Sequence, residues 1–235
     1  MSKESNAEIL KLAAEEYETA KAPFKIIREK TALLVIDLLE AFVSPDGDFF
    51  CPEFLKIIPK VKKLIQICRK VKIPVIYVIE CFHPKGYDKG LMWDMPLNKG
   101  IENALIEGSK GVKIYHETEP APGDIKIIKK RYSAFYETNL NSILRNLGRD
   151  TVIICGCMTN YCCGHTARDA FSNDYKVIFG SDVTATDNPE IHRCELKTLR
   201  RGYALIMSFD EIIKELKTRS KKSSSKVEKK ISMLQ

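Results

Sequence analysis

An acid, a cation and a thiol each stand at the end of an apolar run in this chain. The residues and runs are Asp37 after 32–36, Lys129 at the end of 125–129, and Cys162 a short turn after 151–155. Short runs of Val, Ile and Leu separated by amphipathic segments are typical of parallel strands, whose carboxyl ends border the ligand crevice. We therefore expect the three side chains to meet in one crevice, as the groups of a cysteine hydrolase.

Asp37 and Lys129 also have ordinary structural explanations. A carboxylate at a strand end could cap the segment that follows, and Lys129 begins a Lys-Lys-Arg sequence that could be a solvated cationic edge. A charged group at the end of a hydrophobic strand is costly unless it has a partner or a task. The convergence of three reactive groups on three strand ends is what favours a catalytic role.

Cys162 has a local context that many core cysteines lack. It falls in the first turn of a helix predicted over 161–172, with Thr159 or Asn160 as the N-cap. The positive end of the helix dipole would lower the pKa of the Cys162 thiol and favour the thiolate. This context predicts that Cys162 is a nucleophile.

The order of the predicted elements indicates one α/β domain. Strands are predicted over 32–37, 74–80, 125–129, 151–155, 176–181 and 203–207, and helices over 7–20, 53–71, 139–147, 161–172, 189–200 and 210–218. This alternation predicts a three-layer α/β/α sandwich with a six-stranded, mostly parallel, Rossmann-like sheet. The region 81–123 lacks periodicity and holds the sole tryptophan, and a loop of that length is more often functional than idle.

The net charge of +7 is concentrated near the carboxyl end. The segment 217–230 contains seven Lys and Arg and one Glu, a net +6, so the rest of the chain is nearly neutral. Its composition is typical of disorder, and no aromatic residue is interleaved to stack on bases. We favour a solvated tail over a targeting or RNA-binding arm. The predicted divisions are an N-terminal helical extension (1–29), a hydrolase domain (30–216) and a basic tail (217–235).

Several other classes of protein find little support in the sequence. There is no apolar run of the roughly 20 residues that span a bilayer, and no apolar core of a signal peptide. We expect a cytoplasmic protein with reduced cysteines and no nucleic-acid or membrane partner. The thiols at 155, 157, 162 and 163 do not form two Cys-x-x-Cys pairs, so structural zinc is disfavoured. The sequence also lacks glycine-rich nucleotide motifs, and we expect no cofactor.

Four segments together resemble a known family. They are 32–42 (ALLVIDLLEAF), 129–139 (KKRYSAFYETN), 152–171 (VIICGCMTNYCCGHTARDAF) and 181–185 (SDVTA). Over about residues 30–215 the chain resembles the isochorismatase-like cysteine hydrolases, which include nicotinamidases, N-carbamoylsarcosine amidohydrolases, and ureidoacrylate and biuret hydrolases. The resemblance implies a catalytic triad of Asp37, Lys129 and Cys162. It selects Lys129 over the adjacent lysine and Cys162 over the adjacent cysteine.

The resemblance also implies a mechanism. Asp37 would take the proton of Cys162, the thiolate would form a thioester with a small amide or ureido substrate, and Asp37 would protonate the departing ammonia. Lys129 would orient Asp37 and stabilise negative charge. The backbone N–H groups of Met158 and Cys162 would form the oxyanion hole, next to a cis peptide bond between Cys157 and Met158.

One departure from the family bears on the substrate. Nicotinamidases carry a metal site built on Asp-x-His and a later His, whereas this chain has Cys81 and His83 and lacks the later His. We therefore expect no catalytic metal and doubt nicotinamidase activity. The segment 83–93 is more similar to the substrate loop of carbamoyl and ureido hydrolases.

Five side chains are expected to contact the substrate: Phe42, His83, Trp93, Tyr132 and Tyr161. For His83 an ordinary loop histidine is an equal alternative, and Trp93 could instead belong to the core. The resemblance also implies a homodimer or homotetramer. Two alternative functions stay open: an isochorismatase-type vinyl-ether hydrolase, and a non-catalytic, redox-sensing protein on the same fold.

Overall fold

The computed structural model describes residues 24–101 and 103–217. The predicted helix over 7–20 and nearly all of the basic tail lie outside these ranges. Within them, no helix is both long enough and apolar enough to cross a membrane.

The centre of the molecule is a six-stranded sheet. Its strands are β1 (Thr31–Ile36), β2 (Val75–Glu80), β3 (Ile125–Lys129), β4 (Thr151–Cys157), β5 (Lys176–Ala185) and β6 (Leu205–Met207). The spatial order is β3-β2-β1-β4-β5-β6, and every pairing is parallel. All residues of β1, β2 and β4 are buried, as expected for apolar strands covered on both faces. The prediction of a six-stranded sheet is confirmed, with all strands parallel.

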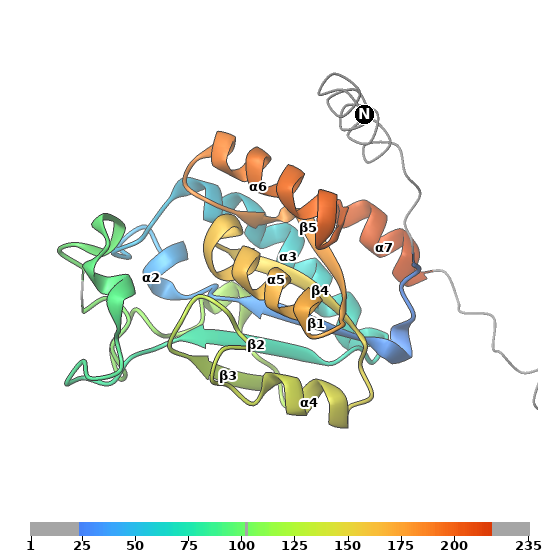
Figure 1. The fold of residues 1–235 in the computed structure, drawn as a ribbon, viewed down its shortest axis with the longest axis horizontal. Helices are drawn as coiled ribbons and strands as arrows, with labels where there is room; N and C mark the ends of the chain where they lie inside the picture. The colour runs from blue at the N-terminus through green and yellow to red at the C-terminus, as the bar shows by residue number, and fades with distance from the viewer. Residues whose placement is uncertain (1–23, 102, 218–235) are drawn as a thin grey trace, which may run out of the picture.

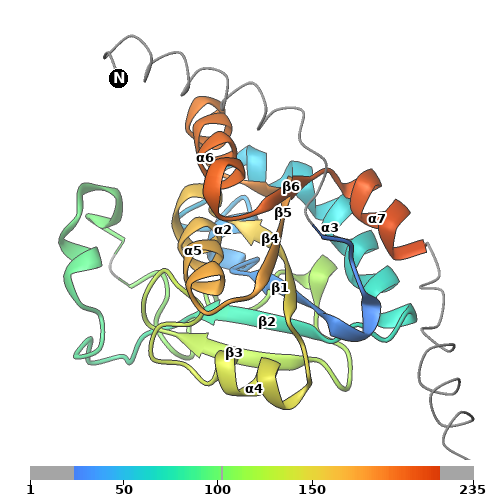
Figure 2. The ribbon, with the colours of Figure 1, turned by 45° about the vertical axis from the view of Figure 1, so that its right-hand side comes forward.

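Helices cover both faces of the sheet. They are α2 (Glu40–Val43), α3 (Pro52–Lys70), α4 (Leu140–Asn146), α5 (Gly164–Ser172), α6 (Pro189–Gly202) and α7 (Phe209–Lys217). One core is formed with α3 and α7, and a second, on the opposite face, with α4, α5 and α6. Figures 1 and 2 show these two helical layers on either side of the strands. The three-layer sandwich is therefore confirmed.

From β1 the chain adds β2 and β3 on one side of the sheet and β4, β5 and β6 on the other, so the order of strand addition reverses between β1 and β4. In sheets of this kind the ligand crevice forms at such a point, beyond the carboxyl ends of the strands. The two strands approach closely here because Gly156 on β4 has a φ of +120° and lies against Ile36 of β1. The pairing of β4 with β5 also shifts register between Ile154 and Gly156. Gly156 thus shapes the sheet just before the turn that carries Cys162.

Replacing Gly156 with alanine is expected to lower the free energy of unfolding by about 3 kcal/mol or more. A Cβ at this position would lie 2.0 Å from the carbonyl oxygen of Ile36, which is backbone and cannot move aside. Gly148→Ala is the matched control, because Gly148 also has a positive φ but has open space around it. The control should cost about 1 kcal/mol. Urea denaturation of both variants measures the difference, and equal costs would refute the contact.

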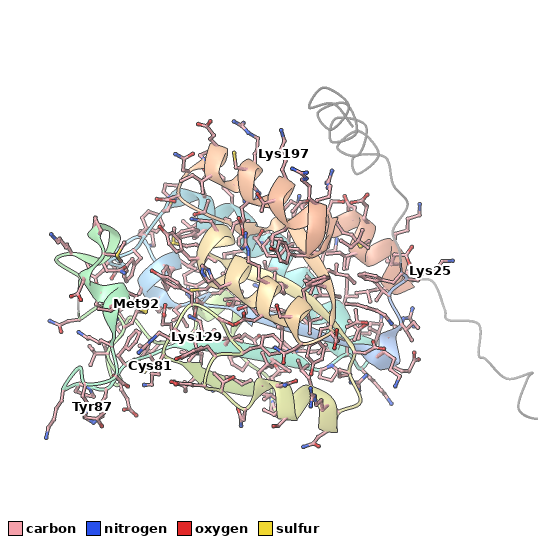
Figure 3. The ribbon with its side chains drawn as sticks, viewed as in Figure 1. Lys25, Cys81, Tyr87, Met92, Lys129 and Lys197 are labelled. Carbon is pink, nitrogen blue, oxygen red and sulfur yellow. The ribbon has the colours of Figure 1, made fainter. Side chains whose placement is uncertain are left out.

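The segment between β2 and β3 extends beyond the carboxyl edge of the sheet (Figures 1 and 2). It contains three 3₁₀ turns: η2 (Leu91–Asp94), η3 (Pro96–Asn98) and η4 (His116–Thr118). An isolated bridge of Phe82 with Ile106 joins two parts of this segment, and a bridge of Leu39 with Ile114 attaches it to the body. Figure 3 places Lys129 on the inner side of this segment and Tyr87 at its outer tip. The region that lacked periodicity therefore covers the edge where ligands are expected.

Candidate active site

Four ionisable side chains meet at the carboxyl ends of four neighbouring strands. Asp37 directly follows β1, Glu80 ends β2, Lys129 ends β3, and Cys162 follows β4. Each side chain is at most 3% exposed. Glu80 and Lys129 are register partners, and Asp37 takes a left-handed φ of +46°, a conformation that Asp tolerates better than most residues. The strand order therefore brings together groups that are far apart in the sequence.

The Lys129 ammonium lies at the centre of this group. Its Nζ is 2.9 Å from Asp37 Oδ2, 3.4 Å from Glu80 Oε1 and 3.3 Å from Cys162 Sγ. Asp37 also accepts a hydrogen bond of 2.7 Å from the backbone N–H of Glu80. The Cys162 thiol contacts Glu80 Oε2 at 3.9 Å. One cation is thus shared by two carboxyl groups and a thiol.

The turn that carries Cys162 differs from the one predicted. Residues Thr159–Cys163 form a π-helical turn, η5, and α5 begins only at Gly164. Neither predicted N-cap acts as one: Thr159 Oγ1 pairs with His192 Nδ1 at 2.8 Å, and Asn160 Oδ1 accepts from Thr186. These side chains hold the turn against neighbouring segments instead of capping a helix. The N-cap prediction was therefore wrong.

The pKa of Cys162 departs from its usual value in the direction opposite to the prediction. Burial raises the pKa of the Cys162 thiol well above that value. The Lys129 ammonium opposes the rise, and the two neighbouring carboxyl groups reinforce it. The helix-dipole argument omitted this desolvation, which disfavours a buried thiolate. Cys162 is therefore a thiol at rest and needs a base beside it to become a nucleophile.

Lys129 and Glu80 also have shifted pKa values, for different reasons. Burial lowers the pKa of Lys129, but the acidic groups around its ammonium, Asp37 foremost, hold the pKa well above the usual value. Burial raises the pKa of Glu80 to about 7, even though the Lys129 ammonium lowers it. The site therefore keeps its lysine charged and gives Glu80 a proton near neutral pH.

Asp37, Glu80 and Cys162 offer donor atoms that lie within 4.8 Å of one another, close enough to surround a metal ion. However, the Lys129 ammonium contacts all three residues at 2.9 to 3.4 Å. A second cation among the same atoms would be repelled by it. The chemistry of this donor set is that of ligands to an ammonium, and we do not assign them as metal ligands.

A pocket of about 370 Å³, its mouth included, opens at this site. Its lining consists of Phe42, Phe49, Glu80, Met92, Trp93, Asn98, Leu105, Tyr132, Met158, Tyr161 and Cys162. Most of its wall is aromatic or aliphatic, as is usual for small-molecule sites. Among the four ionisable groups of the site, Glu80 and Cys162 border the pocket, whereas Asp37 and Lys129 lie behind them. Cys162 is therefore reached from an apolar pocket.

The side chains expected to contact the substrate do not all lie at the pocket. Phe42, Trp93, Tyr132 and Tyr161 line it, and His83 does not. The ring of His83 stacks on Tyr87 with centroids 4.3 Å apart. Trp93 belongs to both the wall and the core, since its indole packs edge-on against neighbouring phenylalanine rings.

The backbone at the predicted oxyanion hole contains the predicted cis bond. The peptide bond between Cys157 and Met158 is cis. Met158 and Cys162 both border the pocket, and the Cys157 thiol donates to the carbonyl oxygen of Asp37 at 3.1 Å. This contact joins the end of β4 to Asp37, the residue that follows β1.

The arrangement has counterparts in known proteins. A model of the isochorismatase domain matches residues 31–211. The chain belongs to the isochorismatase family. It is 34% identical to nicotinamidase 3 of Arabidopsis thaliana over 190 residues, 79% of this chain and 88% of that protein. It is 28% identical to an N-carbamoylsarcosine amidase of an Arthrobacter species over 189 residues, 80% of this chain and 71% of that protein.

The solved structures agree with the family assignment. A cysteine hydrolase from Pseudomonas syringae pv. phaseolicola 1448A has a TM-score of 0.78 and 29% identity, covering 84% of this chain and 98% of that chain. The resemblance inferred from four sequence segments is therefore confirmed. Like the relatives with which it is compared, this isochorismatase-family protein has the fold of a hydrolase.

Glu80 is a site residue that was not predicted from the sequence. It ends an apolar strand, as Lys129 does, so the signal that selected Lys129 was present for Glu80 as well. Asn98 was also missed: it lines the pocket and donates from Nδ2 to the carbonyl oxygen of Met92 at 2.6 Å. No strand pattern marks Asn98, because it lies in the irregular segment.

Proposed function

We propose that this isochorismatase-family protein is a cysteine amidohydrolase that cleaves a small amide, carbamoyl or ureido compound and releases ammonia. The observation that carries the proposal is the position of the Cys162 sulfur. It borders the pocket and lies 3.3 Å from Lys129 Nζ, which is itself 2.9 Å from Asp37. A thiol beside an ion-paired carboxylate is the arrangement of an activated nucleophile.

The proposed reaction passes through a thioester. Asp37 takes the proton of Cys162, and the thiolate attacks the carbonyl carbon of the substrate. The backbone N–H groups of Met158 and Cys162 stabilise the resulting oxyanion; removing one such donor typically costs about 10² to 10³ in rate. The C–N bond then breaks, ammonia leaves with a proton from a carboxyl group of the site, and water hydrolyses the thioester. Lys129 offsets the negative charge throughout.

The lining of the pocket favours substrates without a net charge. Among the described residues that line it, none is Lys or Arg. The nearby Lys129 is already shared by Asp37 and Glu80. A substrate carboxylate would lose its hydration without gaining a partner, which is costly in an apolar pocket. Uncharged amides and ureas are therefore favoured over carbamoyl amino acids and ureido acids.

The same argument weighs against vinyl-ether hydrolysis. Isochorismate carries two carboxylates, and the described pocket wall offers them no free cation. The relatives named above are called a nicotinamidase and an N-carbamoylsarcosine amidase, and both names denote amide hydrolysis. Nicotinamide therefore belongs among the candidate substrates, although this chain has Cys81 in place of the aspartate of the nicotinamidase metal site.

Ammonia release from a panel of substrates tests the proposal. The panel contains nicotinamide, benzamide, biuret, N-carbamoylsarcosine and ureidoacrylate, with pyruvate release from isochorismate measured in parallel and the Cys162→Ala protein as the blank. We expect turnover of at least one amide or urea, and fastest turnover of an uncharged one. Pyruvate release without any ammonia would replace the proposal by vinyl-ether hydrolysis. Absence of both products from folded protein would overturn the proposal.

A further inference from the structure

The site contains one more carboxyl group than its cation neutralises. Asp37 and Glu80 both lie against Lys129, and all three side chains are buried. The adjacent Lys130 does not compensate, because it pairs with Asp88 at 2.7 Å. A buried carboxylate without a counter-ion is costly, so one of the two carboxyl groups must hold a proton.

The geometry distinguishes the two carboxyl groups. Asp37 has the shorter contact with Lys129 Nζ, 2.9 Å against 3.4 Å for Glu80. Asp37 also accepts the N–H of Glu80 at 2.7 Å. Ion pairing and N–H donation both favour the ionised form of a carboxyl group. Asp37 is therefore the carboxylate, and the proton resides on Glu80.

Glu80 is also the carboxyl group that a substrate can reach. It borders the pocket together with Cys162, and Asp37 does not. Its Oε1 faces Lys129 Nζ at 3.4 Å, and its Oε2 is 3.9 Å from the Cys162 sulfur. The leaving nitrogen of an amide is bonded to the carbonyl carbon that Cys162 attacks, so a carboxyl group this close to the sulfur can reach that nitrogen.

We propose that Glu80 is a second catalytic acid–base residue, which protonates the departing amine and later deprotonates the hydrolytic water. The inference rests on the amidohydrolase function proposed above. Asp37 then serves only the sulfur: it takes the thiol proton before attack and returns it when the thiolate leaves. The two carboxyl groups divide the proton transfers between the nucleophile and the leaving group.

The proton balance closes over one turnover. In acylation, the S–H proton of Cys162 moves to Asp37, the new C–S bond replaces the C–N bond, and the proton of Glu80 converts the leaving NH₂ to ammonia. In deacylation, Glu80 takes a proton from water, the hydroxide displaces the sulfur, and Asp37 protonates it. The products are ammonia and the carboxylic acid, and every group of the site regains its starting state.

Glu80→Gln tests this division with two substrates of the same acyl group. The first is the panel amide with the fastest turnover, and the second is the p-nitrophenyl ester of the corresponding acid. Nitrophenolate leaves without a proton, so its release does not need an acid. For Glu80→Gln we expect kcat/KM for the amide to fall about 10² to 10⁴-fold. The burst of nitrophenolate should stay within about threefold of wild type, followed by slower turnover because deacylation lacks its base.

The pH profile provides an independent readout. Glu80 faces Asp37, Lys129, Cys162 and, across the pocket, Tyr132, and burial raises its pKa to about 7. Because the protonated form is the active one, amide kcat/KM of the wild type should fall about tenfold per pH unit above about 7. Glu80→Gln should lack this fall, and so should ester acylation by the wild type.

The outcomes separate this inference from the function on which it rests. Exposed Glu107→Gln is the matched control and should behave as wild type, and the ester burst reports how many sites are folded. Amide turnover by Glu80→Gln within about threefold of wild type would overturn the proposed role of Glu80 and leave the amidohydrolase function intact. Equal losses with amide and ester would show that Glu80 is structural. Amide turnover that survives in Cys162→Ala would overturn the amidohydrolase itself.

Discussion

Cys162→Ala is expected to lower amide hydrolysis by about 10⁴-fold or more. In the proposed mechanism the sulfur forms the covalent intermediate, and neither carboxyl group of the site can replace it as a nucleophile toward an amide. Removing it also frees Lys129 Nζ from a 3.3 Å contact without creating an unpaired charge. Initial rates of ammonia release, measured together with the thermal unfolding midpoint, separate lost chemistry from lost structure.

The fold should survive this substitution. The thiol is small, and shortening it to alanine removes one atom next to an existing pocket. Cys194→Ala is the matched control, because Cys194 is an exposed thiol, and it should retain full activity. A Cys162→Ala protein with substantial amide turnover would contradict the proposed nucleophile, whatever its stability.

Lys129→Met is expected to lower the free energy of unfolding by about 3 to 5 kcal/mol and to abolish activity. Methionine fills similar volume but removes the cation between Asp37 and Glu80, which are both buried. Two buried carboxyl groups would then remain without a counter-ion, and both would need protons to stay buried. Urea denaturation at several pH values measures the loss.

The loss should depend on pH in a defined direction. Lys129 lowers the pKa of Glu80, so without the lysine this pKa rises further above its value in the unfolded chain, and the folded variant binds more protons. Its stability deficit should therefore be larger at pH 8 than at pH 5.

Glu80→Gln added to Lys129→Met should recover part of the deficit. Lys126→Met on the same strand is the control, since Lys126 is exposed, and its effect should stay within about 0.5 kcal/mol. A deficit independent of pH would contradict the shared-cation account.

The sheet was predictable because its strands are nearly continuous apolar runs. The residues of β1 are Thr-Ala-Leu-Leu-Val-Ile, all buried, and no helical periodicity competes with them. The long helix α3 was equally clear from its spacing of buried side chains. The extension of β4 to Cys157 was not predicted, because it depends on the close approach of Gly156 to another strand. Such an approach is a tertiary contact that local propensity does not contain.

The candidate site was predictable to the extent that strand ends locate it. Asp37 and Lys129 were selected by this rule, and Glu80 obeys the same rule but was passed over. The protonation of Cys162 could not be predicted, because it depends on burial and on two carboxyl groups brought in by other strands. The pocket wall also depends on the irregular segment before β3. Its path is set by isolated bridges rather than by a repeating pattern.

Trapping the acyl-enzyme tests the central claim most directly. The wild type is mixed with its fastest panel amide, quenched in acid during turnover, digested and sequenced by mass spectrometry, with hydroxylamine interception measured in parallel. The account predicts an acyl group on Cys162 rather than on the adjacent Cys163, and a hydroxamate product that Cys162→Ala does not form. Steady ammonia release with neither adduct nor hydroxamate, or with the acyl group on another residue, would contradict it.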